Sequence, residues 1–180
     1  LAYANMKKTI ELVDGQWLVY DLGGGTFDVA LIRIKDGEMK VIDHEGDNFL
    51  GGSDFDSLII EKIVIPKICS EYSFDNLEDQ MKSASGKYNT NYYSLLYKAE
   101  EAKILLSAVS SAEIIVERME DEDGNQVDME ITITRSEFHN LIQPSIDRTI
   151  AMIKTILTRN SLTANDIQFN LMVGGSTFIP

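Results

Sequence analysis

Two glycine-rich segments, each at the end of a short apolar run, constrain the fold of this chain more than any other feature. The first, Asp21–Asp28, follows the apolar run 17–20, and the second, Val173–Pro180, follows the run 169–173. Short apolar runs bounded by glycine are typical of buried strands. Glycine at a strand end lets a ligand approach the backbone N–H groups, because no Cβ stands in the way. Consecutive N–H donors in a turn form a concave anion site, so the pattern predicts two such strand ends.

The first segment also carries two carboxylates that indicate the kind of anion. Asp21 and Asp28 bracket the turn 23–26, and carboxylates beside a phosphate are the ligands that Mg²⁺ prefers. The segment contains neither the P-loop pattern Gly-x-x-x-x-Gly-Lys-Ser/Thr nor the dinucleotide pattern Gly-x-Gly-x-x-Gly. A tight hairpin turn without a ligand is the structural alternative, but the flanking carboxylates favour phosphate binding. With no lysine in the segment, backbone N–H groups must contact the anion.

Composition limits the remaining classes of function. The 180 residues carry a net charge of −13, which argues against nucleic acid, whose binding needs a basic face, and against an anionic membrane surface. No apolar run approaches the ~18 residues of a membrane-spanning helix. Cys69 is the single cysteine, so the chain holds no internal disulfide and no cysteine-based zinc site. His44 and His139 have no partner at metal-ligand spacing.

Periodicity and turn residues predict the elements. Asp36-Gly37 predicts a hairpin turn, Pro66 a kink or break in a helix, and Thr134–Glu137 a capping box that starts a helix. Strands are expected at 17–21, 26–35, 38–44, 111–119, 126–134 and 168–173, and helices at 1–7, 55–72, 77–82, 94–107 and from 134 to about 159.

Three motifs together resemble one protein family. Asp21–Asp28 resembles the second phosphate-binding hairpin of the DnaK-type heat-shock chaperones, the seventy-kilodalton class of the stress response. Val173–Pro180 is similar to that family's adenosine-binding segment. Between them, Leu50–Asp56 resembles the family signature Leu-Gly-Gly-x-Asp-Phe-Asp. Three motifs in the family's order and at about its spacing are far more specific than any one of them alone.

The resemblance implies an α/β fold, namely lobe II of the actin-like (ribonuclease H-like) ATPase fold with an inserted α+β subdomain. Residues 1–51 and 134–180 are expected to form a unit like subdomain IIA, and residues 52–133 an inserted unit like subdomain IIB. The chain does not begin with Met and stops just past a motif. We therefore expect a piece of a longer protein.

The resemblance also implies roles for individual residues. Asp21 and Asp28 are expected to hold a hydrated Mg²⁺, and Gly24, Gly25 and Thr26 to contact the β- and γ-phosphates of ATP or ADP. The complete set of expected nucleotide-binding residues is Gly23, Gly24, Gly25, Thr26, Gly51, Gly52, Glu100, Lys103, Ser107, Gly174, Gly175, Ser176 and Phe178.

Some of these residues also have a purely structural interpretation, and one of them departs from the family pattern. Glu100, Lys103 and Ser107 share one helix face by their spacing, and that spacing alone is also typical of a solvated helix surface. The family places Glu, Lys and Ser at this spacing in its adenosine site. Where the family usually has an arginine that covers the adenine, this chain has Phe178. A phenyl ring can also stack on a base, although it carries no positive charge.

By resemblance, the function is that of part of the ATP-binding domain of a cytoplasmic molecular chaperone. ATP binding and hydrolysis would be coupled to the binding of client polypeptides, with a J-domain protein and a nucleotide exchange factor as co-chaperones. The other lobe of the family supplies a further phosphate hairpin, a lysine and a glutamate. We therefore expect ATPase activity of the longer protein and not of this chain alone.

Two other classes of function stay open. The longer protein could be a different actin-like ATPase, such as a sugar kinase or a filament protein, although Leu50–Asp56 together with Glu100 and Lys103 argues against that class. Alternatively, it could be a degenerate relative that binds partners without hydrolysing ATP, with Phe178 as a symptom of that change.

Overall fold

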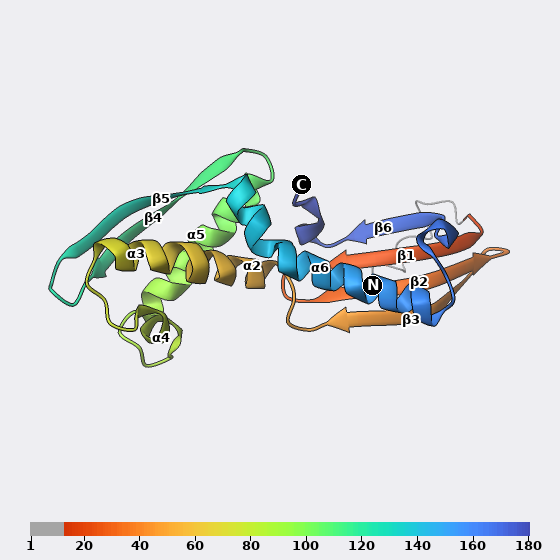
Figure 1. Cartoon of the computed structure of the whole chain (residues 1–180), viewed down its shortest axis with the longest axis horizontal. Coiled ribbons are helices and arrows are strands. Elements are labelled where there is room, and N and C mark those ends of the chain that lie inside the picture. The colour runs from red at the N-terminus through yellow and green to blue at the C-terminus, as the bar shows by residue number, and fades with distance from the viewer. Residues whose placement is uncertain (1–12) are drawn as a thin grey trace. The chain divides into compact units, whose positions relative to one another are not determined.

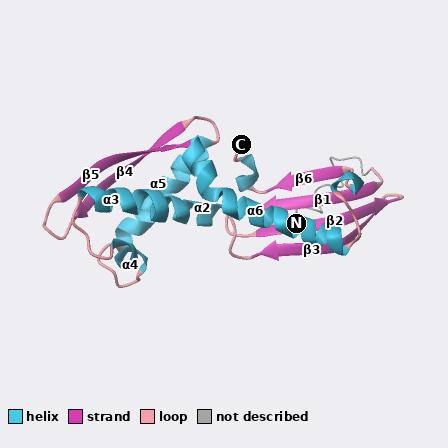
Figure 2. Cartoon of the chain, in the orientation of Figure 1, coloured by secondary structure: helices cyan, strands magenta, loops and turns pink. Residues whose placement is uncertain are grey.

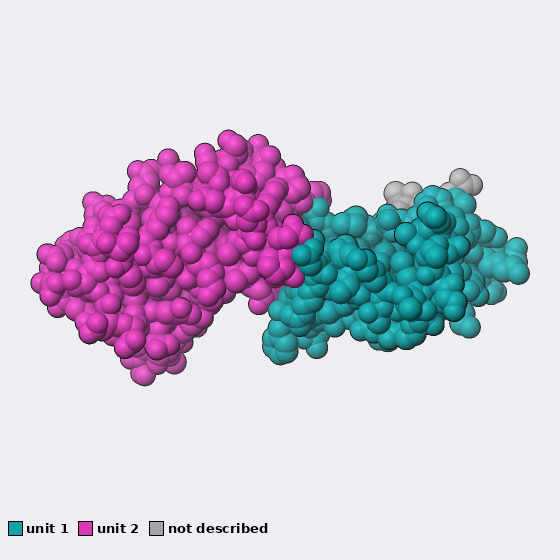
Figure 3. Space-filling view, viewed as in Figure 1, with its two compact units in different colours: residues 1–50, 146–177 teal, residues 51–145, 178–180 magenta. Residues whose placement is uncertain are grey.

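The computed structural model describes residues 13–180, so the helix expected at 1–7 lies outside the described residues. The chain is a mixed α/β protein (Figure 2) that divides into two compact units (Figure 3). The first unit is formed by Leu1–Leu50 with Ile146–Thr177, and the second by Gly51–Ser145 with Phe178–Pro180. The likeness of these units to subdomains IIA and IIB stays a prediction. No helix within residues 13–180 combines the length and the apolar character needed to cross a membrane.

The first unit is built on a four-stranded sheet with the order β3-β2-β1-β6 (Figure 1). The strands β1 (Gly15–Leu22), β2 (Phe27–Lys35) and β3 (Glu38–Asp47) form an antiparallel meander. The strand β6 (Phe169–Val173) comes from the far end of the chain and pairs in parallel with β1. The four strands predicted for this unit are confirmed, with small shifts at their ends.

The turn between β2 and β3 shows why the meander forms where it does. Asp36 and Gly37 have φ angles of 52° and 76°. Both values lie in the left-handed region that a two-residue hairpin turn requires, and Asp-Gly adopts that region readily. The predicted hairpin turn is therefore confirmed.

Both faces of this sheet are covered, because β1 and β2 are apolar on each side. One face carries the cluster of Trp17, Val19, Ala30, Ile32 and Ile34. The other face carries Tyr20, whose hydroxyl shares a 2.9 Å hydrogen bond with the Thr149 hydroxyl of α6 (Arg135–Arg159). A strand that is buried on both faces reads as a continuous apolar run, as the stretch 17–20 does.

The helix α6 begins with the predicted capping box and runs through Pro144. The N–H of Glu137 donates to the Thr134 hydroxyl at 3.2 Å, and the N–H of Thr134 donates to the Glu137 carboxylate at 2.8 Å. The first turn of the helix thereby gains partners for its N–H groups. Both predicted features, the capping box and the end of the helix at Arg159, are confirmed.

Arg159, the last residue of α6, ties this helix to β3. Its guanidinium donates to both carboxylate oxygens of Asp43, at 2.7 and 2.8 Å, and to Glu45 at 2.6 Å. The paired hydrogen bonds from Arg159 lower the pKa of Asp43 well below its usual range. Asp43 is therefore more acidic in the folded state than in the unfolded chain.

We expect Arg159→Gln to lower the melting temperature at pH 7 and to lose that effect in acid. A depressed folded-state pKa contributes stability above the unfolded pKa, ~3.9 for Asp, and this contribution is lost as the pH falls through the folded value. Melting temperatures of the wild type and the variant, measured from pH 7 down to about pH 2, should begin to approach each other below about pH 4 and move closer as the pH falls further. A gap that stays constant over this range would contradict the assignment.

The second unit combines helices with a two-stranded antiparallel sheet of β4 and β5. Asp54 fixes the start of its first helix, because its carboxylate accepts the N–H of Gly51 at 2.8 Å. Pro66 is the second residue of the helix that follows a π-helical turn, and a missing N–H disturbs a helix least in its first turn. The elements are α2 (Gly52–Ile59), the π turn η1 (Ile60–Val64), α3 (Ile65–Glu71), α4 (Leu77–Lys82), α5 (Asn89–Leu106), β4 (Ser111–Glu120) and β5 (Gln126–Thr134).

Candidate functional site

Two aspartates are directly opposite each other at one end of the sheet in the first unit. The antiparallel register places Asp21 of β1 directly opposite Asp28 of β2, and the parallel register places Asp21 opposite Val173 of β6. Residues that are directly opposite in a sheet point to the same face, and like charges in such a pair repel each other. A cation between Asp21 and Asp28 would remove that repulsion.

The turn that joins these two strands is held by an internal backbone hydrogen bond and is exposed to solvent. The N–H of Gly23 donates to the carbonyl of Thr26 at 3.0 Å, while Gly24, Gly25 and Thr26 are exposed. A Cβ built on Gly24 would meet no atom within 4 Å. Packing within the protein therefore does not require glycine at this position, and the space above the turn is open to a ligand.

The second glycine-rich segment lies against the first. The hydroxyl of Ser176 donates to the carbonyl of Gly23 at 3.0 Å. Gly174 has a φ of +93°, and a Cβ at this position would lie 2.2 Å from the carbonyl oxygen of Leu22. The structure thus brings together two predicted segments from opposite ends of the chain, and the close approach at Gly174 depends on the missing side chain.

The chemistry of this strand end fits a hydrated Mg²⁺ beside phosphate. Among residues 13–180, no group of three or more His, Cys, Asp and Glu side chains is placed to hold a metal ion. A Mg²⁺ that keeps several of its waters needs only one or two carboxylates together with phosphate oxygens. Asp21 and Asp28 meet that requirement, and the exposed turn 23–26 lies between them in the chain.

In the second unit, Lys103 connects two of the predicted site segments. Its ammonium donates to the carbonyl of Gly52 at 2.9 Å and to the Asp56 carboxylate at 2.7 Å. Glu100 is exposed one turn earlier on α5, and Ser107 is the C-terminal capping residue of that helix. The structure therefore brings Lys103 and Gly52 into contact. The role of these residues toward a nucleotide stays a prediction.

Asp56 is not among the nucleotide-binding residues expected from the sequence, but the structure places its carboxylate in contact with Lys103. Its side chain is only 8% exposed, and its Oδ1 atom has no hydrogen-bond partner among the described residues. Burial raises the pKa of Asp56, and the hydrogen bond from Lys103 opposes that rise. A signal was present in the sequence, because Asp56 lies between the apolar helix positions Phe55 and Ile59.

Phe178 does not belong to the described core. It ends the short 3₁₀ helix η3 (Gly175–Phe178), and its side chain is 79% exposed. An exposed phenyl ring is available to a ligand or to a partner. Its proposed contact with a base stays a prediction.

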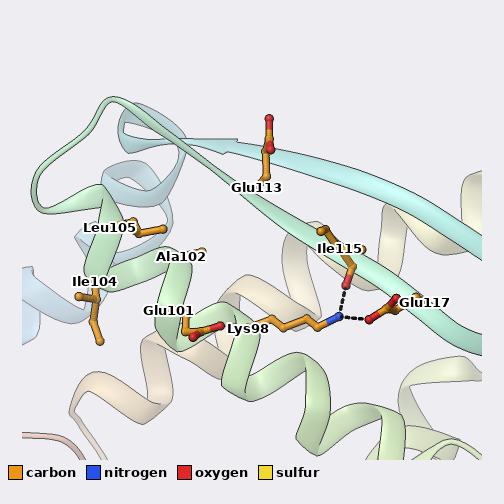
Figure 4. A pocket seen from close by; sticks show the side chains of 8 residues that line it. All are labelled: Lys98, Glu101, Ala102, Ile104, Leu105, Glu113, Ile115 and Glu117. Atoms are coloured by element: carbon orange, nitrogen blue, oxygen red, sulfur yellow. Dashed lines mark hydrogen bonds and ion pairs between the residues drawn. The ribbon is translucent and has the colours of Figure 1, made fainter.

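A cavity of about 580 Å³ lies between α5 and β4 in the second unit (Figure 4). None of the predicted site residues lines it. Lys98 lines the cavity and donates to the carbonyl of Ile115 at 2.8 Å and to the Glu117 carboxylate at 3.3 Å, as the dashed lines in Figure 4 show. Apolar side chains at Ile104 and Leu105 form part of its wall.

Comparison with known proteins connects these features to a family. The family model described as Hsp70 protein matches residues 1–180. The chain is 38% identical over 163 residues to chaperone protein DnaK of Mycoplasma mobile, and 39% identical over 163 residues to the proteins of that name from Mycoplasmopsis synoviae and Metamycoplasma hominis. Each alignment covers 91% of this chain and 26% of the relative. The chain therefore spans about a quarter of the length of these relatives.

Proposed function

The chain belongs to the Hsp70 family, and from that premise we propose that it is part of the ATP-binding domain of a molecular chaperone. The longer protein couples the binding and hydrolysis of ATP to the binding and folding of client polypeptides. In this proposal the mixed α/β architecture corresponds to lobe II of the actin-like ATPase fold. The hydrogen bond from Ser176 to Gly23 carries the proposal, because it joins the expected phosphate and adenosine segments in one place.

Each part of the strand end has a role in this proposal. The backbone N–H groups of the turn 23–26 bind the β- and γ-phosphates, and the Gly174–Ser176 segment lies against the nucleoside. Asp21 and Asp28 hold a hydrated Mg²⁺, which neutralises phosphate charge when it is bound. Phosphoryl transfer to water depends almost entirely on positioning and on electrostatic stabilisation. The turn 23–26 would contribute to positioning the phosphates, and Asp21 and Asp28 to electrostatic stabilisation through the metal.

The proposed partners act through the longer protein. They are client polypeptides, a J-domain protein and a nucleotide exchange factor, in a cytoplasmic setting. The family match argues against a sugar kinase or a filament protein. A relative that binds partners without hydrolysing ATP remains the second candidate, because Phe178 stands where the family usually has arginine.

Nucleotide titration and phosphate release of the full-length protein with Mg²⁺ and ATP test this proposal. We expect ATP binding and slow turnover by the full-length protein, and no turnover by the 180-residue chain alone. Gly24→Val serves as the background, because its side chain would fill the space above the turn. Binding without turnover in the full-length protein would favour the second candidate, and absence of binding would overturn the proposal.

We expect Phe178→Ala in the full-length protein to weaken adenine-nucleotide binding by about 1 kcal/mol, the scale of an aromatic stacking contact. The melting temperature should stay unchanged, because the side chain is 79% exposed. Phe49→Ala is the matched control, since Phe49 is 84% exposed and is outside the proposed site. Unchanged affinity in Phe178→Ala, with a lower melting temperature, would show that the ring is structural.

A further inference from the structure

The ammonium of Lys103 is held at the junction of two segments of the second unit. It donates to the carbonyl of Gly52, at the start of α2, and to the carboxylate of Asp56, one turn further along the same helix. Lys103 itself lies on α5. One ammonium group therefore links the Gly51-Gly52 segment to the helix that carries Glu100 and Ser107.

The number of donors on this ammonium leaves one of them for a ligand. A lysine ammonium has three N–H donors and no acceptor. Two of the three are directed to Gly52 and Asp56, at 2.9 and 2.7 Å. The Lys103 side chain is still 11% exposed, so solvent or a ligand reaches it over a small area. The fixed pair of hydrogen bonds determines where the third N–H can point.

Burial of the Asp56 carboxylate costs free energy, because the charged group loses its contact with water. Its side chain is more than nine-tenths buried, and its Oδ1 atom has no partner among the described residues. A buried ion pair is often no more stabilising than a well-packed apolar pair of similar volume. Fold stability alone therefore does not account for this carboxylate, whereas the orientation of a flexible four-carbon side chain does.

We propose that Asp56 is a positioning residue that holds the Lys103 ammonium against the Gly52 carbonyl, so that its third N–H is presented to the nucleoside part of bound ATP or ADP. This inference rests on the proposed function, because it needs a nucleotide at Lys103. Asp56 itself touches no ligand and acts only through Lys103. Without the carboxylate, Lys103 has to be ordered at the moment of binding, which lowers the affinity.

The same helix provides a matched control. Lys98 of α5 also donates to one carbonyl, that of Ile115, and to one carboxylate, that of Glu117. This second pair is much more exposed, with side-chain exposures of 26% and 48%. Glu117→Gln thus makes the same chemical change as Asp56→Asn at an ion pair that is outside the proposed nucleotide site.

The test compares Asp56→Asn, Lys103→Met, the double variant and Glu117→Gln in the full-length protein. ADP affinity is measured by calorimetric titration, and kcat and KM for ATP by phosphate release. We expect Asp56→Asn to weaken ADP binding about tenfold, the smaller end of what a hydrogen bond to a charged group contributes. It should raise KM and leave kcat unchanged, because the nucleoside is remote from the reacting phosphate. Glu117→Gln should match the wild type.

The double variant separates positioning from general damage. If Asp56 acts through Lys103, Asp56→Asn should have no further effect on ADP affinity in the Lys103→Met background, since coupled residues give non-additive effects. Equal losses in both backgrounds, or unchanged affinity with a lower melting temperature, would overturn the inference. Failure of the proposed function is a different result, namely a wild-type protein that binds no ADP.

Discussion

Asp21→Asn in the full-length protein should lower the rate of ATP hydrolysis by about a hundredfold, the scale of losing one electrostatic group aimed at developing charge. The affinity for ATP should fall much less. Asparagine keeps the size of the side chain and one oxygen but removes the charge, and Asp28 remains opposite it in the sheet. Charge neutralisation by the metal matters most in the transition state, so the loss of a metal-orienting carboxylate acts chiefly on the rate.

The control for this change is Asp36→Asn in the neighbouring hairpin turn. Asp36 has a φ of 52°, and asparagine adopts this left-handed conformation as readily as aspartate does. Asp36→Asn should therefore leave both the hydrolysis rate and the ATP affinity at wild-type values. Equal losses of rate and affinity in Asp21→Asn, or no loss in either, would contradict the role assigned to Asp21.

Gly174→Ala should destabilise the first unit by about 3 kcal/mol, which combines the cost of an unfavourable φ with that of overpacking. The added Cβ would lie 2.2 Å from the carbonyl oxygen of Leu22 and 2.9 Å from the Asp21 carboxylate. Because the clash is with backbone, the 174–176 segment has to move away from β1. That movement should also break the hydrogen bond from Ser176 to Gly23 and weaken nucleotide binding.

Urea unfolding of the chain, followed by the fluorescence of its single tryptophan, measures this effect. Trp17 is 4% exposed and lies in β1, so it reports on the first unit. Gly37→Ala separates the two causes, because Gly37 has a φ of +76° and a Cβ there meets nothing within 4 Å. It should cost only about 1 kcal/mol. Equal destabilisation of the two variants would show that the contact with Leu22 is not limiting.

Most of the secondary structure could be predicted from local sequence signals, namely periodicity, turn residues and helix caps. The helix predicted at 77–82 and the strand predicted at 126–134 are confirmed with those ends. The helix α5, in contrast, begins at Asn89 and not at the predicted Ser94. Its first turn is held by tertiary bonds, because the Asn89 amide donates to Met81 and the Asn91 amide donates to Arg118. Bonds of that kind leave no trace in the periodicity of the helix.

The contacts of the candidate site also fall into two kinds, those that a local sequence signal predicts and those that depend on tertiary packing. The pairing of Asp21 with Asp28 follows from a short hairpin, which the sequence signals directly. The contact between Ser176 and Gly23 depends on a parallel pairing of two distant strands, and the ion pair of Lys103 with Asp56 on the packing of two helices. Contacts of this kind are set by tertiary packing and leave no local pattern in the sequence. The family resemblance indicated that the segments of Ser176 and Gly23 belong to one site, but no pattern indicated the ion pair of Lys103 with Asp56.

The position of β6 beside β1 also fixes an order of events during synthesis. Nearly all of the second unit is one continuous stretch, residues 51–145, so it can fold as soon as it has left the ribosome. β1–β3 are made earlier, yet β1 has an open edge until residues 169–173 emerge. An open edge of that kind is a template for pairing with another chain. The sheet that is synthesised first is therefore completed last, and the nascent protein is most exposed to mispairing while its inserted stretch is already folded.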